Sequence, residues 1–310
     1  MGFAKILGQE PAVQGLRHAF EKNRVSHAYL FEGPEGVGKK TTALAFAELL
    51  LCQEPAGSEA CGVCNSCHMM AAGMHPDLIT VAPDGKSIKI KQIRELRTCL
   101  GVSSRQGGYT VVVIEAADTM GIEAANALLK TIEEPQGPTV FLLLATSMRL
   151  PQTILSRVQR IHFRPLSEKV LVRLLGEDDE RAQMAARLSR GSLTRARALL
   201  ADEAAWEEKR ARQEALEEKL ASLTSTHPGH LVSYADTLMG KREEALEAVV
   251  MVRAWLEKRL RHDLTMGRDV GALLAATQDT TKALERLETN TEPAFIMGAL
   301  FIEMSAHLRQ

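Results

Sequence analysis

A glycine-rich loop at Gly33–Lys40 limits this chain to a small set of folds. The loop reads Gly-Pro-Glu-Gly-Val-Gly-Lys-Lys and lies between an apolar, β-rich segment, Ala28–Phe31, and a helical pattern, Thr41–Leu51. A phosphate-binding loop works in this setting, because the backbone N–H groups and the positive end of the helix dipole both face the phosphate. We therefore expect an α/β fold that binds phosphate at this loop.

The loop departs from the usual Gly-x4-Gly-Lys-Ser/Thr pattern at its last position. Lys39 is the lysine that would contact the β and γ phosphates, but Lys40 stands where a hydroxyl would bind Mg²⁺. The hydroxyl of Thr41 faces another direction, because an α-helix turns about 100° per residue. We therefore expect phosphate binding without efficient hydrolysis. The predicted nucleotide-binding residues of the loop are Gly33, Gly36, Gly38, Lys39, Lys40 and Thr41.

Glu115 and Thr146 complete the predicted nucleotide site. Val111–Ile114 is followed by Glu115, like the strand that ends in an acidic Mg²⁺ ligand in P-loop ATPases. The next residue is Ala116, where those enzymes usually carry a second carboxylate that activates water. Thr146 ends a later β-rich segment, where a polar sensor of the γ-phosphate would lie. The alternative for Glu115 is a surface carboxylate at a strand end, and the alternative for Thr146 is a threonine that only terminates its strand. Because Lys40 and Ala116 affect the two functions that hydrolysis needs, we interpret them as loss of catalysis on a retained scaffold.

Strands and helices alternate in the first half of the chain, which predicts a five-stranded parallel sheet covered on both faces. Besides Ala28–Phe31, the β-rich segments are Leu78–Val81, Val111–Ile114, Val140–Ala145 and Arg160–Phe163. After Pro165 the patterns are helical only. We expect three domains: 1–164 with the phosphate loop, 165–202 with short helices, and 203–310 with long helices.

Four of the five cysteines, Cys52, Cys61, Cys64 and Cys67, are clustered. The last three recur every third residue and can meet at one ion, and Cys52 can close a tetrahedral site. Zinc is a better interpretation than disulfides for a cytosolic chain, and chance clustering is the alternative. Four thiolates leave no open position, so we expect a structural zinc module at 52–67. We expect His75 to be a solvated loop residue and Cys99 to lie in the core.

The composition is that of a globular protein. Apolar residues make up 45% of the 310 residues and charged residues 25%, and no apolar run approaches the roughly 20 residues of a membrane span. The net charge of −1 argues against strong DNA binding by this chain alone. The N-terminal residues have neither the apolar core nor the cleavage site of a signal peptide, so a cytoplasmic location is expected.

Taken together, the motifs resemble the delta-prime family of bacterial DNA polymerase III clamp-loader subunits, within the AAA+ superfamily. The resemblance covers roughly the first 165 residues. Besides the phosphate loop and the four cysteines, it is carried by Ile6-Leu7-Gly8-Gln9, Ser26-His27-Ala28-Tyr29-Leu30-Phe31, Asn126-Ala127-Leu128-Leu129-Lys130, Glu133-Glu134-Pro135 and Ser156-Arg157.

This resemblance implies an AAA+ P-loop domain, a helical lid and an all-α collar that assembles into a hetero-oligomeric ring. It implies that Arg157 acts as an arginine finger in trans, at the ATP site of a neighbouring subunit; Val158 replaces the cysteine that usually follows. The implied partners are the gamma/tau ATPase subunits and the clamp-opening delta subunit, with the sliding clamp and primer–template DNA reached through the complex and no membrane. Binding of ATP or ADP would be weak, with no hydrolysis of its own, although the chain would be a component of a DNA-directed DNA polymerase holoenzyme.

The runner-up is a catalytically active clamp-loader ATPase of the gamma/tau type, with Thr41 or water replacing the missing hydroxyl. That family shares the cysteine module, but it keeps the Ser/Thr of the loop and an Asp-Glu pair at the second site, and both are absent here. A zinc-stapled nucleic-acid-binding protein would need a basic stretch with interleaved aromatic residues. A small-molecule kinase would need an acceptor-binding pattern, and none is evident.

Overall fold

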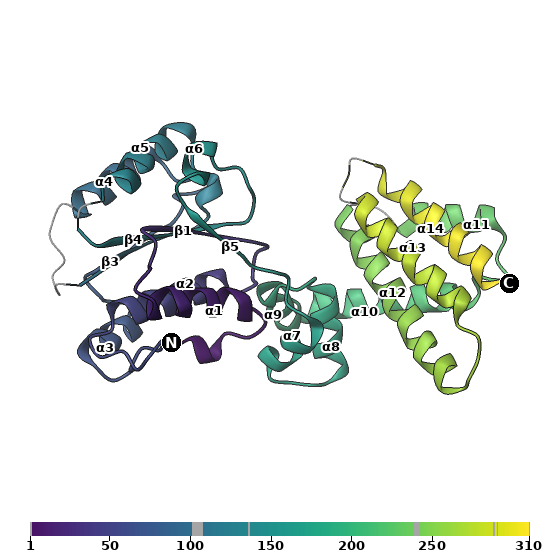
Figure 1. Ribbon diagram of the computed structural model, residues 1–310. Helices are drawn as coiled ribbons and strands as arrows, with labels where there is room; N and C mark the ends of the chain where they lie inside the picture. The colour runs from purple at the N-terminus through teal and green to yellow at the C-terminus, as the bar shows by residue number, and fades with distance from the viewer. Residues whose placement is uncertain are drawn as a thin grey trace. The chain divides into compact units, whose positions relative to one another are not determined.

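The computed structural model describes residues 2–100, 108–135, 137–238, 242–287, 289 and 291–309. The chain forms two compact units, Met1–Arg197 and Ala198–Gln310. The first unit contains a β-sheet with its covering helices, followed by a small group of helices, and the described part of the second unit is helical (Figure 1). The predicted order, an α/β region before an all-α region, is confirmed.

Five parallel strands form the sheet, in the order β2-β3-β4-β1-β5. The strands are β1 (Ala28–Glu32), β2 (Leu78–Val81), β3 (Thr110–Ile114), β4 (Thr139–Ala145) and β5 (Gln159–His162). Each predicted strand agrees with the observed one to within one residue at either end. Because β1 pairs with β4 in the register Glu32↔Ala145, the loop after β1 and Thr146 after β4 leave the sheet at the same edge.

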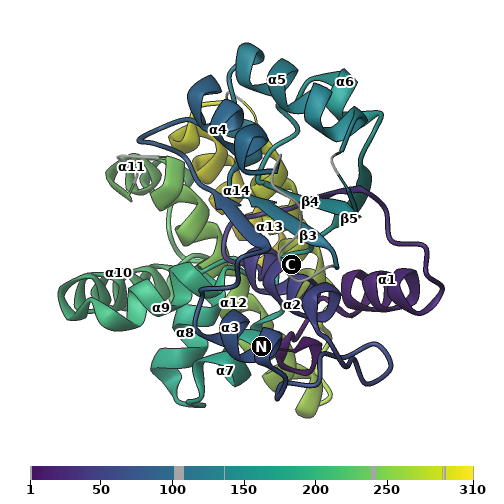
Figure 2. The same cartoon turned by 90° about the vertical axis from the view of Figure 1, so that its left-hand side faces the viewer.

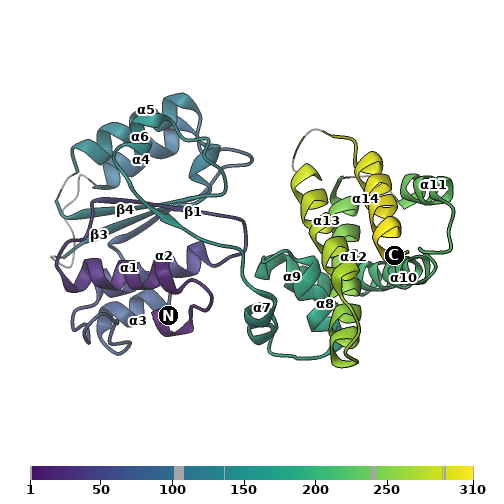
Figure 3. The same ribbon diagram turned by 45° about the vertical axis from the view of Figure 1, so that its right-hand side comes forward.

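The side chains of β1 alternate between two apolar cores, as a strand covered on both faces requires. Tyr29 and Phe31 pack on the side of α1 and α2, whereas Ala28 and Leu30 pack on the side of α4 and α5. Figure 3 shows the sheet between these two layers of helices. The helices of this region are α1 (Glu10–Glu21), α2 (Lys39–Leu51), α3 (Asn65–Ala71), α4 (Ile90–Leu100), α5 (Ile122–Glu133) and α6 (Gln152–Leu155), with 3-10 turns η1 (Phe3–Lys5) and η2 (Ala117–Thr119).

Three short helices follow the sheet and lie close to one another (Figure 2). They are α7 (Glu168–Leu175), α8 (Glu180–Leu188) and α9 (Leu193–Ala201). Ser167 and Asp179 cap the first two with side-chain oxygens, and Gly176 ends α7 in the left-handed region at φ 83°. Since α9 crosses the division between the compact units, the domain boundaries 164/165 and 202/203 stay predictions.

The second unit is built from long helices, as predicted. They are α10 (Glu203–Ala221), α11 (Pro228–Leu238), α12 (Arg242–Thr265), α13 (Gly271–Leu287) and α14 (Pro293–Leu308). The strongly apolar α14 packs against α11 and α13, and it buries Met297, Phe301 and Met304. No helix in the described part of the chain has the length and apolar character needed to cross a membrane.

Candidate nucleotide-binding site and metal centre

The phosphate loop connects β1 to α2 and depends on glycine at two close approaches. Gly33 packs on the backbone just after β5, where a Cβ atom would lie 2.3 Å from the carbonyl oxygen of Phe163. Gly36 packs on the start of α9, where a Cβ would lie 2.2 Å from Oγ of Ser192, and its carbonyl accepts a hydrogen bond from the N–H of Leu193. Larger residues would displace the loop at both positions. The start of α9 therefore contacts the phosphate loop directly.

Lys39 is held inside the loop. Its Nζ donates hydrogen bonds to the carbonyl oxygens of Gly33, at 2.6 Å, and Pro34, at 2.5 Å. Burial lowers the pKa of Lys39, and the negative charges of Asp118 and Glu35 oppose that shift. The ammonium would have to exchange these carbonyl oxygens for phosphate oxygens to bind a nucleotide.

Lys40 and Glu115 form an ion pair. Nζ of Lys40, in the first turn of α2, lies 2.7 Å from Oε1 of Glu115, the residue that follows β3. The Glu115 side chain is 24% exposed and that of Lys40 is 57% exposed. Thr41 is solvent-exposed on the next position of the helix. From the sequence, Lys40 was a departure from the phosphate-loop pattern and Glu115 a possible metal ligand. The ion pair between them was not predicted.

Asp118 binds the two residues that follow β4 and was not predicted as a site residue. Its Oδ2 accepts hydrogen bonds from Oγ1 of Thr146 at 2.9 Å and from the N–H and Oγ of Ser147 at 2.9 and 2.7 Å. Burial raises the pKa of Asp118, but the bonds from Ser147 and Thr146 outweigh it, so the pKa lies below its usual range. The signal for Asp118 was its place just beyond the carboxyl end of β3, the edge where open α/β sheets bind ligands. Thr146 thus binds a carboxylate of its own chain.

Gln9 connects the phosphate loop to Arg164, just beyond β5, and was also not predicted as a site residue. Its side chain is 2% exposed, and its Nε2 donates to the carbonyl oxygens of Val37, at 3.2 Å, and Arg164, at 2.7 Å. Its Oε1 accepts from the N–H of Arg164 at 3.2 Å. No spacing rule could have identified these bonds, because they depend on where residues 155 positions apart in sequence fold together.

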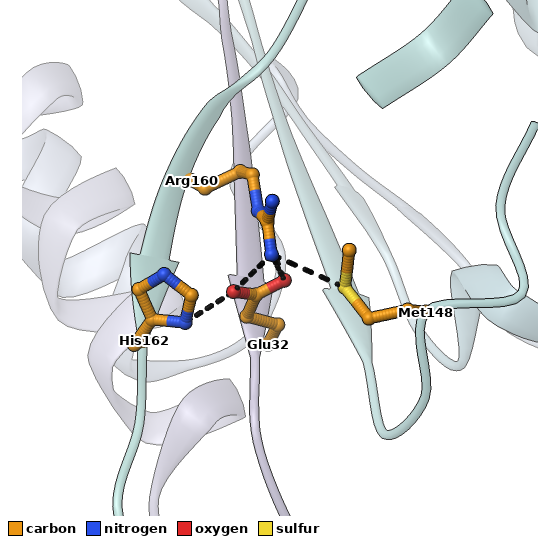
Figure 4. Close-up of polar contacts among 4 residues, drawn as sticks. All are labelled: Glu32, Met148, Arg160 and His162. Atoms are coloured by element: carbon orange, nitrogen blue, oxygen red, sulfur yellow. Dashed lines mark hydrogen bonds and ion pairs between the residues drawn. The ribbon is translucent and has the colours of Figure 1, made fainter. Parts of the chain in front are cut away.

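Glu32, the last residue of β1, connects that strand to the neighbouring edge strand β5 just before the phosphate loop. The Glu32 side chain is only 9% exposed, and it accepts hydrogen bonds from Nη2 of Arg160 at 2.9 Å and from Nε at 3.2 Å. His162 contacts the same carboxylate, and Sδ of Met148 lies 3.5 Å from Nη2 of Arg160 (Figure 4). A buried carboxylate is stable only when its charge is compensated in this way.

Arg157 lies between α6 and β5, apart from the phosphate loop. Its Nε is 2.6 Å from Oε1 of Glu133, the last residue of α5. Its Nη1 donates to the carbonyl oxygen of Thr153 and to Oγ of Ser156, both at 3.0 Å. Among the residues that the structure describes, none that contacts Arg157 belongs to the loop Gly33–Lys40. In the described part of the chain, the structure therefore does not bring the predicted finger into contact with the predicted phosphate loop.

The four cysteines form one cluster. Their Sγ atoms all lie within 4.8 Å of one another, with Cys52 and Cys64 at 4.0 Å and Cys61 and Cys67 at 4.0 Å. A tetrahedron of zinc–sulfur bonds of about 2.3 Å has edges of about 3.8 Å, so the cluster fits a metal such as zinc.

The backbone around the cysteines donates hydrogen bonds to their sulfur atoms, whereas burial raises the pKa of Cys52 and Cys67. The N–H groups of Cys61, Cys64 and Cys67 each point at the Sγ of the preceding cysteine of the cluster, at 3.3 to 3.4 Å. Burial raises the pKa of Cys64, but hydrogen bonds from the N–H groups of Cys67 and Gln53 outweigh it and lower the pKa to about 6. Such outer-shell donors are typical of metal–thiolate sites.

Two predictions near this module are wrong. His75 is 4% exposed rather than solvated: its Nε2 lies 2.8 Å from Oγ of Ser66, and its Nδ1 accepts from the N–H of Asp77. Burial therefore lowers the pKa of His75, although the charge of Asp77 opposes this. Cys99 is exposed rather than in the core, because the buried stripe of α4 runs along Ile93, Leu96 and Leu100.

We compared the chain with known proteins to find its family. The chain is 46% identical over 135 residues to DNA polymerase III subunit delta' of Pseudomonas aeruginosa, a match that covers 43% of this chain and 41% of the relative. It is 42% identical over 171 residues to the subunit delta' of Bacillus subtilis, which covers 55% and 52%. It is 35% identical over 201 residues to the subunit tau of Escherichia coli, which covers 62% and 31%. The chain thus spans about half or less of the length of these relatives.

A solved structure of a gamma subunit-related protein from Thermotoga maritima covers 96% of this chain and 99% of its own, with a TM-score of 0.41 and 18% identity. The family model described as "DNA polymerase III, delta subunit" matches residues 8–167, more than half of the chain. The matched segment contains the phosphate loop, the four cysteines and Arg157. The resemblance found in the sequence is therefore confirmed, and the chain belongs to the DNA polymerase III delta-subunit family, on the delta' side and related to tau.

Proposed function

We propose that this chain is a non-motor subunit of the sliding-clamp loader of DNA polymerase III. It assembles with gamma/tau ATPase subunits and the clamp-opening delta subunit, and it reaches the sliding clamp and primer–template DNA through that complex. Its own phosphate loop binds ATP or ADP weakly and does not hydrolyse it. Arg157 completes the ATP site of a neighbouring subunit. The names and sequences of its relatives support the first part, and the residues of its site support the rest.

The ion pair between Lys40 and Glu115 is the observation that best supports our proposal that this chain does not hydrolyse ATP. In a hydrolysing site a hydroxyl and a carboxylate at these positions both bind Mg²⁺. Here an ammonium contacts that carboxylate at 2.7 Å, so the residues do not fit the metal. The next residue, Ala116, supplies no base and adopts a left-handed backbone at φ 47°. Both requirements for activating water are therefore missing.

The nucleotide affinity of this loop should be low for a second reason. Lys39 already donates two hydrogen bonds to the carbonyl oxygens of Gly33 and Pro34, and a phosphate group would have to replace both. The helix that follows the loop still offers its N-terminal N–H groups to an anion. We therefore expect weak, static nucleotide binding at Gly33–Thr41, with Glu115 and Thr146 at its edge.

Arg157 is suited to act on a neighbouring subunit because it is exposed and its guanidinium is permanently charged. Its side chain is 41% exposed, and its polar contacts in the described chain are with Glu133, Thr153 and Ser156. A trans-acting arginine raises the rate at a phosphoryl-transfer site by about 10³- to 10⁵-fold where it has been measured.

The second proposed cofactor is a zinc ion bound by the four clustered cysteines. We expect them to bind one zinc ion through four thiolates, which leaves no position for a substrate. The ion would fix the excursion between α2 and β2. Glu59 in this excursion accepts a hydrogen bond from the N–H of Phe3 and contacts Arg17, so the module also holds the N-terminal segment.

The test is Arg157→Ala in a loader reconstituted with its ATPase subunits, delta, the clamp and primed DNA. We expect stimulated ATP hydrolysis to lose the contribution of the site next to this chain, with assembly unchanged. Arg187→Ala is the matched control, because Arg187 also pairs through Nε with a glutamate, Glu168, at 3.2 Å. An unchanged ATPase rate in an intact Arg157→Ala complex would exclude the finger.

A further inference from the structure

Arg157 is held by three contacts that leave one nitrogen of its guanidinium available. Nε is bound to Glu133 at 2.6 Å, and Nη1 is bound to the carbonyl oxygen of Thr153 and to Oγ of Ser156 at 3.0 Å. Among the residues that the structure describes, none accepts a hydrogen bond from Nη2. The guanidinium is planar, so fixing two of its nitrogens fixes the direction of the third.

Glu133 occupies a position that the helix itself does not favour. It is the last residue of α5, where the negative end of the helix dipole repels a carboxylate. Glu134 follows as the C-terminal cap, so two carboxylates adjoin this helix end. The contact that compensates Glu133 is the ion pair with Arg157. Because both side chains are about two-fifths exposed, this pair contributes little to the stability of the fold.

We propose that Glu133 is a positioning residue for the arginine finger. It holds Nε while Thr153 and Ser156 hold Nη1, so that Nη2 points outward at a fixed angle toward a phosphate oxygen of the neighbouring subunit. This inference rests on the proposed function of Arg157. An unrestrained arginine loses much rotamer freedom when it binds, whereas a guanidinium ordered beforehand loses little.

The same contact could act in the opposite way, as a brake from which Arg157 must be released. The geometry favours positioning, because Glu133 binds Nε and leaves Nη2 without a partner in the described chain. The two roles make opposite predictions for removal of the carboxylate: positioning predicts a slower neighbouring site, and a brake predicts a faster one.

The experiment measures stimulated ATP hydrolysis in the reconstituted loader with Glu133→Ala, Arg157→Ala and the double variant. Glu133→Ala should restore the rotamer freedom of Arg157. The entropy of ordering one arginine side chain corresponds to about a 5- to 30-fold lower rate of hydrolysis at the neighbouring site, seen in kcat and not in KM. Glu133→Gln, which keeps an oxygen acceptor for Nε, should recover part of the rate. In the Arg157→Ala background, Glu133→Ala should have no further effect, because its only route to the reaction is gone.

Glu134→Ala is the matched control, since Glu134 is the adjacent exposed carboxylate and has no ion pair among the described residues. It should leave the rate unchanged, and all variants should assemble and melt as the parent does. If Arg157→Ala lowers the rate but Glu133→Ala leaves it equal or raises it, the positioning role is wrong and the finger stands. If Arg157→Ala has no effect in an intact complex, the proposed function itself fails.

Discussion

Nζ of Lys40 lies 2.7 Å from Oε1 of Glu115, so the residue that replaces a metal-binding hydroxyl is bound to the residue that would bind the metal. The two positions are far apart in sequence and lie on different elements, α2 and the end of β3. The pair neutralises the carboxylate that would attract Mg²⁺. Lys40 therefore puts an ammonium where the hydroxyl and its Mg²⁺ would lie, and Glu115 compensates this charge within the chain.

Replacing Lys40 should expose the carboxylate without creating an ATPase. We expect Lys40→Thr to strengthen Mg²⁺-dependent ADP binding by about 5-fold, which corresponds to about 1 kcal/mol for an exposed ion pair. Hydrolysis should stay at background, because Ala116 still supplies no base. Calorimetric titration with ADP, with and without Mg²⁺, measures this. Lys91→Thr is the control, because Lys91 forms an exposed pair with Glu95 on α4. Equal Mg²⁺ dependence in both variants would contradict the role of Lys40.

Loss of one cysteine of the cluster should destabilise the first unit. We expect about one zinc ion per chain, and Cys67→Ser should abolish stoichiometric metal and lower the free energy of unfolding by about 2–4 kcal/mol. Metal analysis and thermal melting with and without a chelator measure both effects. Cys99→Ser should change neither, because Cys99 is exposed and outside the cluster. A metal-free protein that melts at the same temperature would refute the zinc module.

Asp118 should make the stability of the first unit depend on acid pH. Its pKa is lowered in the folded chain because the bonds from Ser147 and Thr146 outweigh burial. A lowered carboxyl pKa gives stability that is fully present above the unfolded value of about 3.9 and is lost as the pH falls through the folded value. We expect Asp118→Asn to cost about 1 kcal/mol at neutral pH, with the difference from the parent shrinking below about pH 4.

Denaturant unfolding between pH 3 and 7 tests the Asp118 prediction. Asp178→Asn is the control, because Asp178 is an exposed carboxylate in the turn between α7 and α8. A difference between Asp118→Asn and the parent that is the same at pH 3 and pH 7 would show that the charge of Asp118 is unimportant.

The buried amide of Gln9 should couple the phosphate loop to the segment that follows β5 at Arg164. Gln9→Ala removes three hydrogen bonds, to Val37 and Arg164, and leaves buried backbone groups without partners. We expect a loss of about 1–3 kcal/mol in stability and faster amide hydrogen exchange in both connected segments. Gln14→Ala on the exposed face of α1 should have no such effect. Unchanged exchange at residues 33–39 and 164–170 would contradict the coupling.

Local patterns in the sequence predicted the sheet well. The β-rich segments alternate between two covered faces, and their ends are marked by glycine, proline or a polar residue, so each strand was placed to within one residue. The cysteine cluster was predicted for the same reason, because a repeat of three residues brings Cys61, Cys64 and Cys67 together locally.

Contacts between distant residues could not be predicted. The sequence assigned Lys40 and Glu115 to one predicted metal site but did not predict their ion pair, and the bonds of Gln9 depend on the packing of the loop against Arg164. Cys99 shows the limit of periodicity: it adjoins Leu100 in sequence, and a rotation of about 100° places it outside the buried stripe.

Release of phosphate from ATP by the isolated chain in Mg²⁺ tests the central claim most directly. The Lys40–Glu115 pair and the alanine at position 116 predict a rate no higher than that of a Lys39→Ala variant, measured in the same preparation and buffer. Steady Mg²⁺-dependent turnover by the parent chain, lost in Lys39→Ala, would contradict that claim and show that this chain is itself an ATPase.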